Sequence, residues 1–70
     1  MQIFEPKQIR LERKKVGWSQ ADLARETGLS LSGISMIELG NKVPRISTLI
    51  KISEALGCGF QRFFIERDCS

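Results

Sequence analysis

Residues 17–44 read GWSQADLARETGLSLSGISMIELGNKVP and contain the start and stop signals of two short helices in close succession. Ser19 is a preferred N-cap residue, and Asp22 three positions later predicts a short capping box. Gly28 supplies a left-handed stop directly after Thr27. The first helix of this segment is therefore expected to run from the Ser19 cap to Thr27.

The second helix of the segment is expected over residues 31–39, between the N-cap Ser30 and the stop Gly40. About three residues separate the two helices, which is the spacing of a helix-turn-helix. At 100° per residue, Ile34 and Ile37 fall together and are assigned to the core. The opposite side carries small or uncharged side chains: Ser32, Ser35, Met36 and Leu39.

Three further helices are predicted around this pair. Glycines and prolines divide the rest of the chain into segments of helical length, and no segment alternates apolar and polar residues as a strand would. One helix is expected from Pro6 to about Val16, one from Arg45 or Ser47 to Leu56, and a short one from Phe60 to about Glu66. The predicted fold is all-α: a compact bundle of five helices without a sheet. Residues 1–70 are expected to form one domain, with a frayed tail at 67–70.

The inner faces of these helices predict the core. Ile9 and Val16 share the inward face of the first helix with Arg13, and Ile46 lies at core spacing in the fourth. The aromatic stripe of the last helix carries more apolar surface than one short helix can bury, so Phe64 and Ile65 are predicted to form a two-fold dimer interface. The predicted core residues are Leu23, Ala24, Ile34, Ile37, Leu49, Ile52, Leu56 and Phe60, with Phe63 also facing inward.

Composition excludes several classes of protein. The 70 residues contain no histidine and two cysteines, Cys58 and Cys69, which form no CxxC pair. A zinc finger, a disulfide scaffold and a histidine-dependent active site are thereby excluded, and no metal, cofactor or small-molecule ligand is expected. No apolar run approaches the roughly 20 residues of a membrane span. We expect a cytoplasmic protein that is neither membrane-bound nor an enzyme.

Charge is distributed unevenly along the chain. The net charge is +3, and two basic segments flank a slightly acidic middle. Clustered cations are typical of proteins that bind a polyanion, although a solvated helix face has the same appearance. The basic residues of the two segments are Lys7, Arg10, Arg13, Lys14 and Lys15, and then Lys42, Arg45 and Lys51.

The central segment resembles the helix-turn-helix of the Cro and phage-repressor type, often called the Xre family. Gln20, Ala24, Gly28, Ile34 and Ile37 fall at the spacings of that family, and the resemblance extends over nearly the whole chain. It implies a lambda-repressor-like bundle with the helix-turn-helix at about residues 19–39. It also implies a sequence-specific regulator of transcription that binds double-stranded DNA as a homodimer on an inverted-repeat operator.

The resemblance assigns roles to particular residues. An arginine of the first helix and a glutamate at the end of the third, here Arg13 and Glu38, are expected to pair. Glu12 departs from the family pattern, where this position is apolar, and is expected at an edge with its carboxylate in water. The residues expected at DNA phosphates or, for the last of them, the minor groove are Ser19, Gln20, Asn41, Lys42 and Arg45.

Base contacts are expected from the outer face of the third helix. The residues there are Leu31, Ser32, Ser35 and Met36, whereas family members commonly carry amide or guanidinium groups. Serines form single hydrogen bonds, and Leu31 and Met36 can contact only thymine methyl groups. The alternative function is a protein-interaction module of the same fold, such as an antitoxin or repressor partner, whose apolar outer residues bind another protein.

Overall fold

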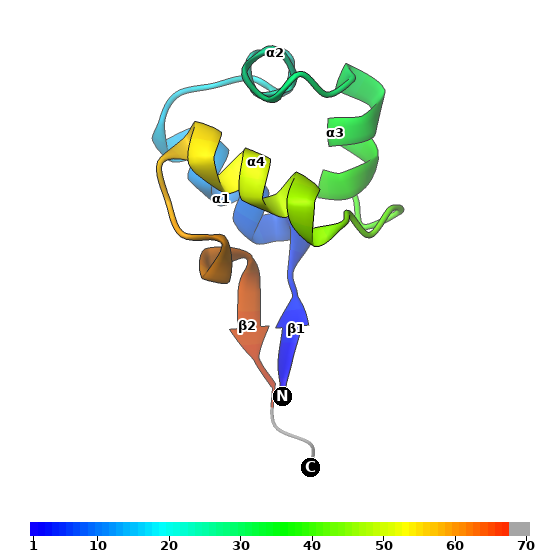
Figure 1. The fold of residues 1–70 in the computed structure, drawn as a ribbon, viewed down its shortest axis with the longest axis vertical. Coiled ribbons are helices and arrows are strands. Elements are labelled where there is room, and N and C mark those ends of the chain that lie inside the picture. Colours follow the sequence, from blue (N-terminus) through cyan, green and yellow to red (C-terminus); the bar gives the residue numbers. More distant parts are fainter. Residues whose placement is uncertain (68–70) are drawn as a thin grey trace.

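α-Helices form the body of the molecule (Figure 1), four of them within the described part of the chain. The computed structural model describes residues 1–67. The elements in chain order are β1 (Gln2–Phe4), α1 (Pro6–Lys15), α2 (Gln20–Thr27), α3 (Leu31–Glu38), α4 (Ile46–Leu56), the 3-10 turn η1 (Phe60–Phe63) and β2 (Phe64–Glu66). The bounds predicted for the first four helices agree with these to within about one residue.

The capping box predicted at the start of α2 is confirmed. The Asp22 N–H donates to Ser19 Oγ at 3.1 Å, and the Ser19 N–H donates to Asp22 Oδ2 at 2.9 Å. Gly28 and Gly40 follow α2 and α3 with φ values of 74° and 81°, a region that L side chains rarely adopt. Gly28 thus ends α2 three residues before α3 begins, and Gly40 lies beyond the end of α3.

The predicted fifth helix and the predicted absence of a sheet are both wrong. Phe60–Phe63 form a single 3-10 turn, and Phe64–Glu66 pair antiparallel with Gln2–Phe4. Each strand has three residues, too few for alternation to be recognised in the sequence, and the pairing joins opposite ends of the chain. The resulting ribbon projects from the helical body (Figure 1).

The prediction of a frayed tail from residue 67 is wrong at its first residue, Arg67. The Arg67 N–H donates to the Met1 carbonyl at 2.8 Å, so Arg67 is held beside the N-terminus rather than frayed. The terminal ammonium of Met1 lies 2.7 Å from Glu66 Oε1. The remainder of the predicted tail, residues 68–70 with Cys69, lies outside the described residues.

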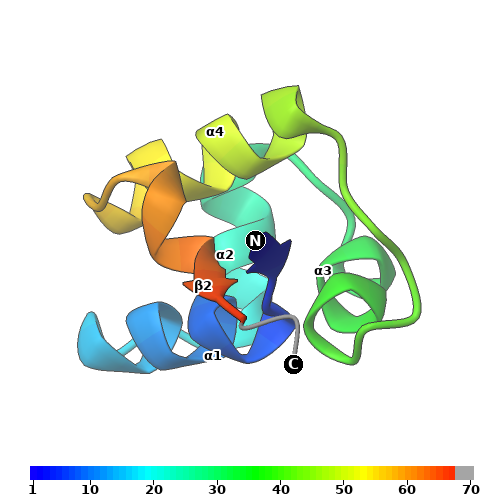
Figure 2. The same cartoon turned by 90° about the horizontal axis from the view of Figure 1, so that it is seen from below.

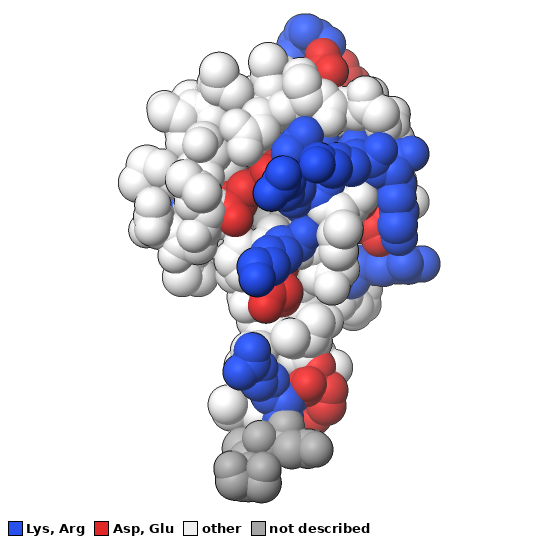
Figure 3. Space-filling model, turned by 180° about the vertical axis from the view of Figure 1, so that it is seen from behind, with Lys and Arg blue, Asp and Glu red and all other residues white. Residues whose placement is uncertain are grey.

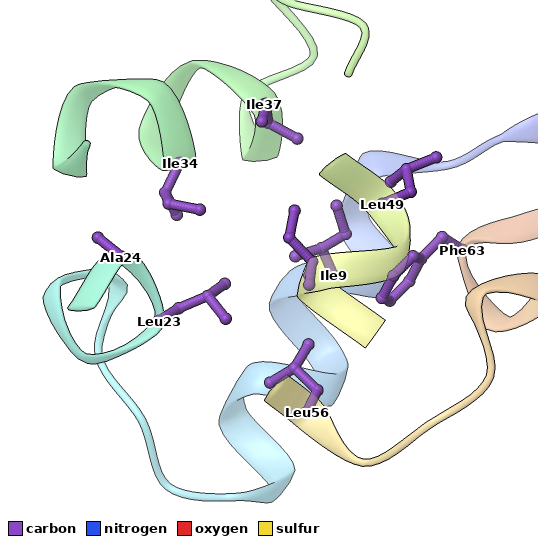
Figure 4. Packing of buried hydrophobic residues seen from close by; sticks show 9 residues of the cluster. Ile9, Leu23, Ala24, Ile34, Ile37, Leu49, Leu56 and Phe63 are labelled. Atoms are coloured by element: carbon purple, nitrogen blue, oxygen red, sulfur yellow. The ribbon is translucent and has the colours of Figure 1, made fainter. Parts of the chain in front are cut away.

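The core lies where α1, α2, α3, α4 and η1 meet (Figure 4). Seven of the eight predicted core residues are buried, but Phe60 is only partly buried and Phe63 occupies the centre instead. η1 packs on α1 and α4, and the last residue of this turn, Phe63, is the one that enters the core. The buried apolar residues are Ile9, Leu23, Ala24, Ile34, Ile37, Leu49, Ile52, Leu56 and Phe63.

Two further residues predicted to face inward are exposed. Val16 has an exposed fraction of 44% because α1 ends before it and Val16 is its C-cap. Ile46 is 55% exposed because it lies in the first turn of α4, at the margin of a buried stripe centred on Leu49 and Leu56.

The helices are arranged so that α3 forms one side of the body. Figure 2 shows α4 and α1 on opposite sides of the molecule, with α3 beside them. α3 contacts α2 and α1, and α2 also contacts α4. Within residues 1–67, no helix is long and apolar enough to cross a membrane.

Candidate nucleic-acid interface

The outward face of α3 is open to solvent. Leu31 and Met36 have exposed fractions of 51% and 45%, Ser32 is exposed and Ser35 is half-buried. Ile34 and Ile37 anchor the opposite face in the core, with exposed fractions of 1% and 4%. α3 thus presents a short uncharged surface, and the four residues predicted to contact bases all lie on it.

A buried ion pair fixes the position of α3. Arg13 Nε donates to Glu38 Oε2 at 2.8 Å, and Arg13 Nη2 donates to Glu38 Oε1 at 3.0 Å. The exposed fractions of the two side chains are 9% and 4%. A third guanidinium nitrogen, Nη1, donates to the Trp18 carbonyl at 2.8 Å. One arginine therefore connects α1, the segment before α2 and the end of α3.

Gln20 joins this network, which sequence reasoning did not anticipate. Its side-chain amide donates to Glu38 Oε1 at 3.1 Å. An amide nitrogen has two hydrogens, so one remains available for an external acceptor. No local sequence pattern indicates this bond, because it joins residues 18 positions apart on two helices.

The start of α2 offers further donors. The capping box engages the backbone N–H groups of Ser19 and Asp22. The N–H groups of Gln20 and Ala21 belong to the first turn, where an α-helix provides no internal acceptor. Together with the positive end of the helix dipole, they form a place where an anion is favourably bound.

A second group of donors lies beyond the C-terminal end of α3. Asn41, Lys42 and Arg45 are all exposed. Lys42 and Arg45 line a cleft of about 430 Å³, which Gly33 and Thr48 also border. Arg45 is the N-cap of α4 and makes no side-chain capping bond, so the first turn of α4 also keeps free N–H groups.

Basic residues of α1 extend the cationic surface. Lys7, Arg10, Lys14 and Lys15 are exposed along α1, and Figure 3 shows Lys and Arg side chains gathered over one face of the helical body. Arg10 lines a cleft of about 280 Å³ together with Gln20, Ser35 and Glu38. Sequence reasoning did not assign Arg10 to the site; its position three residues before Arg13, on the same helix face, is the signal that could have done so.

The two residues predicted at a dimer interface lie in β2 rather than on a helix. Both are half-buried. Phe64 packs against the core, and its ring lies edge to face with those of Phe4 and Phe60 at 6.0 and 6.2 Å between centroids. Ile65 is paired across the ribbon with Ile3. Because adjacent residues of a strand point to opposite faces, Ile3 and Ile65 share the face turned away from Phe64.

The expectation that Glu12 lies at an edge with its carboxylate in water is wrong. Glu12 is 8% exposed, and its Oε1 lies 3.4 Å from both Lys15 Nζ and Arg62 Nη1. η1 packs on α1 and brings Arg62 over the carboxylate, a contact across 50 positions that local sequence cannot reveal. Burial raises the pKa of the nearby Cys58 thiol, and the charge of Glu12 raises it further.

Comparison with known proteins yields one family and several relatives. A helix-turn-helix family model matches residues 9–63. An uncharacterised HTH-type transcriptional regulator of Mycobacterium tuberculosis is 45% identical over 49 residues, which cover 70% of this chain and 19% of the relative. The chain therefore corresponds to about a fifth of the length of the curated relatives that it matches.

Solved structures share the fold over most of the chain. A hypothetical transcription factor from Neisseria, NHTF, is 32% identical with a TM-score of 0.82, over 86% of this chain and 69% of that one. SinR, described as the master regulator for biofilm formation and solved in complex with DNA, is 31% identical with a TM-score of 0.78. That match covers 81% of this chain and 95% of the SinR chain.

Proposed function

The chain belongs to the helix-turn-helix family of the Cro and phage-repressor (Xre) type, and from this premise we propose that it binds double-stranded DNA through α3 and regulates transcription. The observation that carries the proposal is the attachment of α3. Glu38 is held by Arg13 and Gln20 from two other helices, while the outward residues of α3 remain open. A helix held in this way fits the major groove, which is about 12 Å wide.

Phosphate contacts on both sides of α3 would position the protein on the duplex. On one side, Ser19 and Gln20 lie at the start of α2 with free N–H groups of the first turn beside them. On the other side, Asn41 and Lys42 lie next to the start of α4. Arg45 would reach the neighbouring minor groove, where a narrow A·T-rich groove attracts arginine. Arg10 on α1 adds a third cationic contact, after those of Lys42 and Arg45.

The protein acts as a homodimer on an inverted-repeat operator. A two-fold axis would set two copies of α3 about one turn of DNA apart, roughly 34 Å. Ile3 and Ile65 support an interface on the ribbon, since these apolar side chains share the ribbon face turned away from the core. Of the two residues predicted for the interface, Ile65 therefore belongs to the proposed interface face, whereas Phe64 packs against the core.

A protein-interaction module is the second candidate function. The observation that favours it is the apolar character of the α3 face, where Leu31, Met36 and Leu39 have exposed fractions of 51%, 45% and 71%. In such a module these residues would bind a protein partner, and the exposed cations would only add solubility. The two candidates differ in how binding to DNA responds to salt.

A titration of random-sequence duplex DNA at several salt concentrations tests the proposal. Phosphate binding releases counterions, so the logarithm of the binding constant is expected to fall linearly and steeply with the logarithm of the salt concentration. Selection from a random duplex library is then expected to yield an inverted repeat. A protein that binds no duplex even at low salt would contradict DNA binding and favour the interaction module.

A further inference from the structure

The surface that would enter the major groove lacks every side chain able to make two hydrogen bonds to one base. On a wheel at about 100° per residue, Ser32 and Ser35 lie between Leu31 and Met36 on the outward face of α3. Leu39 continues this face one turn further. Arginine, asparagine and glutamine are the side chains that identify guanine and adenine by paired hydrogen bonds, and α3 has none of them.

Among the side chains beside this face that could supply paired hydrogen bonds, Arg13 and Gln20 are engaged elsewhere, and Arg10, which lines the same cleft as Ser35, is the one that we assign to a phosphate. Arg13 uses three of its nitrogens on Glu38 and on the Trp18 carbonyl, and Gln20 donates to the same carboxylate. Turning either one toward a base would leave Glu38 buried and short of donors, which is costly. The apolar side chains of the face are therefore the groups left to distinguish one base pair from another.

We propose that α3 identifies bases by their C5-methyl groups, with Leu31 and Met36 as the residues that contact them. This inference rests on the proposed binding of DNA by α3. In the major groove, the methyl group of thymine is the feature to which an apolar side chain can bind. Half of the Leu31 surface and nearly half of the Met36 surface are exposed and available for such contacts.

The same surface accepts 5-methylcytosine in place of thymine. Both bases carry a methyl group at C5, but thymine presents a carbonyl acceptor beside it and cytosine presents an amino donor. A serine hydroxyl can either donate or accept, so Ser32 and Ser35 accommodate both. The protein thus distinguishes methylated from unmethylated cytosine at the positions that face Leu31 and Met36.

The test compares duplexes that differ in single methyl groups. The probe is the duplex obtained by selection from a random library, with each thymine replaced in turn by deoxyuridine, by cytosine paired with guanine, or by 5-methylcytosine paired with guanine. Deoxyuridine differs from thymidine only in lacking the methyl group. Replacing a contacted thymine by deoxyuridine is therefore expected to weaken binding about fourfold. Methylation of the cytosine at that position is expected to strengthen binding by a similar factor.

Two variants and a control assign the effect to residues. In Leu31→Ala and Met36→Ala, the ratio of thymine to uridine affinity is expected to fall to one at the position that each residue contacts. Leu11→Ala is the matched control, because Leu11 is also 51% exposed but lies on α1; its ratios should equal those of the parent. Circular dichroism confirms that each variant is folded.

Equal affinity for thymine and uridine duplexes at every position would overturn the inference, as would a selected half-site without thymine. In both cases the steep salt dependence would persist and the proposed binding of DNA would stand. Failure to bind any duplex at low salt would overturn both.

Discussion

The carboxylate of Glu38 determines how α3 is attached. It accepts two hydrogen bonds from Arg13 and one from Gln20, and it is nearly inaccessible to solvent. A buried charge is tolerated only when it is paired and hydrogen-bonded, and this carboxylate is. In the proposed complex with DNA, Gln20 would therefore have only part of its hydrogen-bonding capacity left for a phosphate, so we assign more of the phosphate contact to Lys42 and the first turn of α2.

Lys42→Ala is expected to weaken binding to operator and random duplex alike, because a phosphate contact carries no sequence information. The dependence of the binding constant on salt should become shallower by about one unit per subunit. Fluorescence-anisotropy titrations at several salt concentrations measure both quantities. Lys51→Ala removes the same charge from α4 outside the proposed clamp and should leave the slope unchanged. An unchanged slope in Lys42→Ala would show that the clamp lies elsewhere.

Asp22 gives the capping box a pH dependence. The hydrogen bond from the Ser19 backbone, followed by the one from Arg25, holds the pKa of the Asp22 carboxyl below its ordinary value of 3.8. A lowered pKa in the folded state stabilises the protein above the ordinary pKa, and the stabilisation is lost as the pH falls through the folded value. The difference in Tm between the parent and Asp22→Asn, measured by thermal melting, should therefore narrow on acidification below 3.8. A constant difference would contradict this.

At the scale of elements, local signals predicted α1 to α4 and missed the ribbon. N-caps, glycine stops and apolar spacing act within about ten residues, so the bounds of the four helices could be read directly from the sequence. The pairing of Gln2–Phe4 with Phe64–Glu66 depends on contacts between the two ends of the chain, which no local pattern records. The candidate site follows the same division: its DNA-contacting residues are predictions from the resemblance to the family, whereas the bonding of Gln20 and the burial of Glu12 required the tertiary structure.

The contact between α2 and α3 depends on a small side chain at residue 24. Ala24 is 6% exposed, and it faces Ile34 in the core (Figure 4). Ala24→Leu is expected to lower the free energy of unfolding by about 1–3 kcal/mol through overpacking. Urea denaturation followed by circular dichroism measures it. Ala21→Leu is the matched control on the exposed side of α2, where a change within about 0.5 kcal/mol is expected. Equal effects of the two substitutions would contradict close packing at residue 24.

At the scale of the whole molecule, the ribbon projects from the helical body (Figure 1) and carries the proposed dimer interface. Ile65→Lys is expected to yield a monomer in sedimentation, because it places a charge within the proposed apolar interface. Gln2→Lys, on the same ribbon but at an exposed position, should sediment as the parent does. If Ile65→Lys associates as well as the parent, the interface lies elsewhere on the molecule.

The central claim, that the outward face of α3 binds DNA, is tested most directly by placing a negative charge on it. Ser32→Glu introduces a carboxylate in the first turn of α3, where an acidic residue favours the helix, so folding should be retained. Gln61→Glu makes the same change of charge on η1, on another side of the body (Figure 1).

Anisotropy titrations of duplex DNA at low salt should show that Ser32→Glu binds more than about tenfold more weakly than the parent, because a like charge is brought against the phosphates and base acceptors of the groove. Gln61→Glu should bind nearly as well as the parent. If folded Ser32→Glu binds duplex DNA as tightly as the parent does, α3 is not the helix that enters the groove.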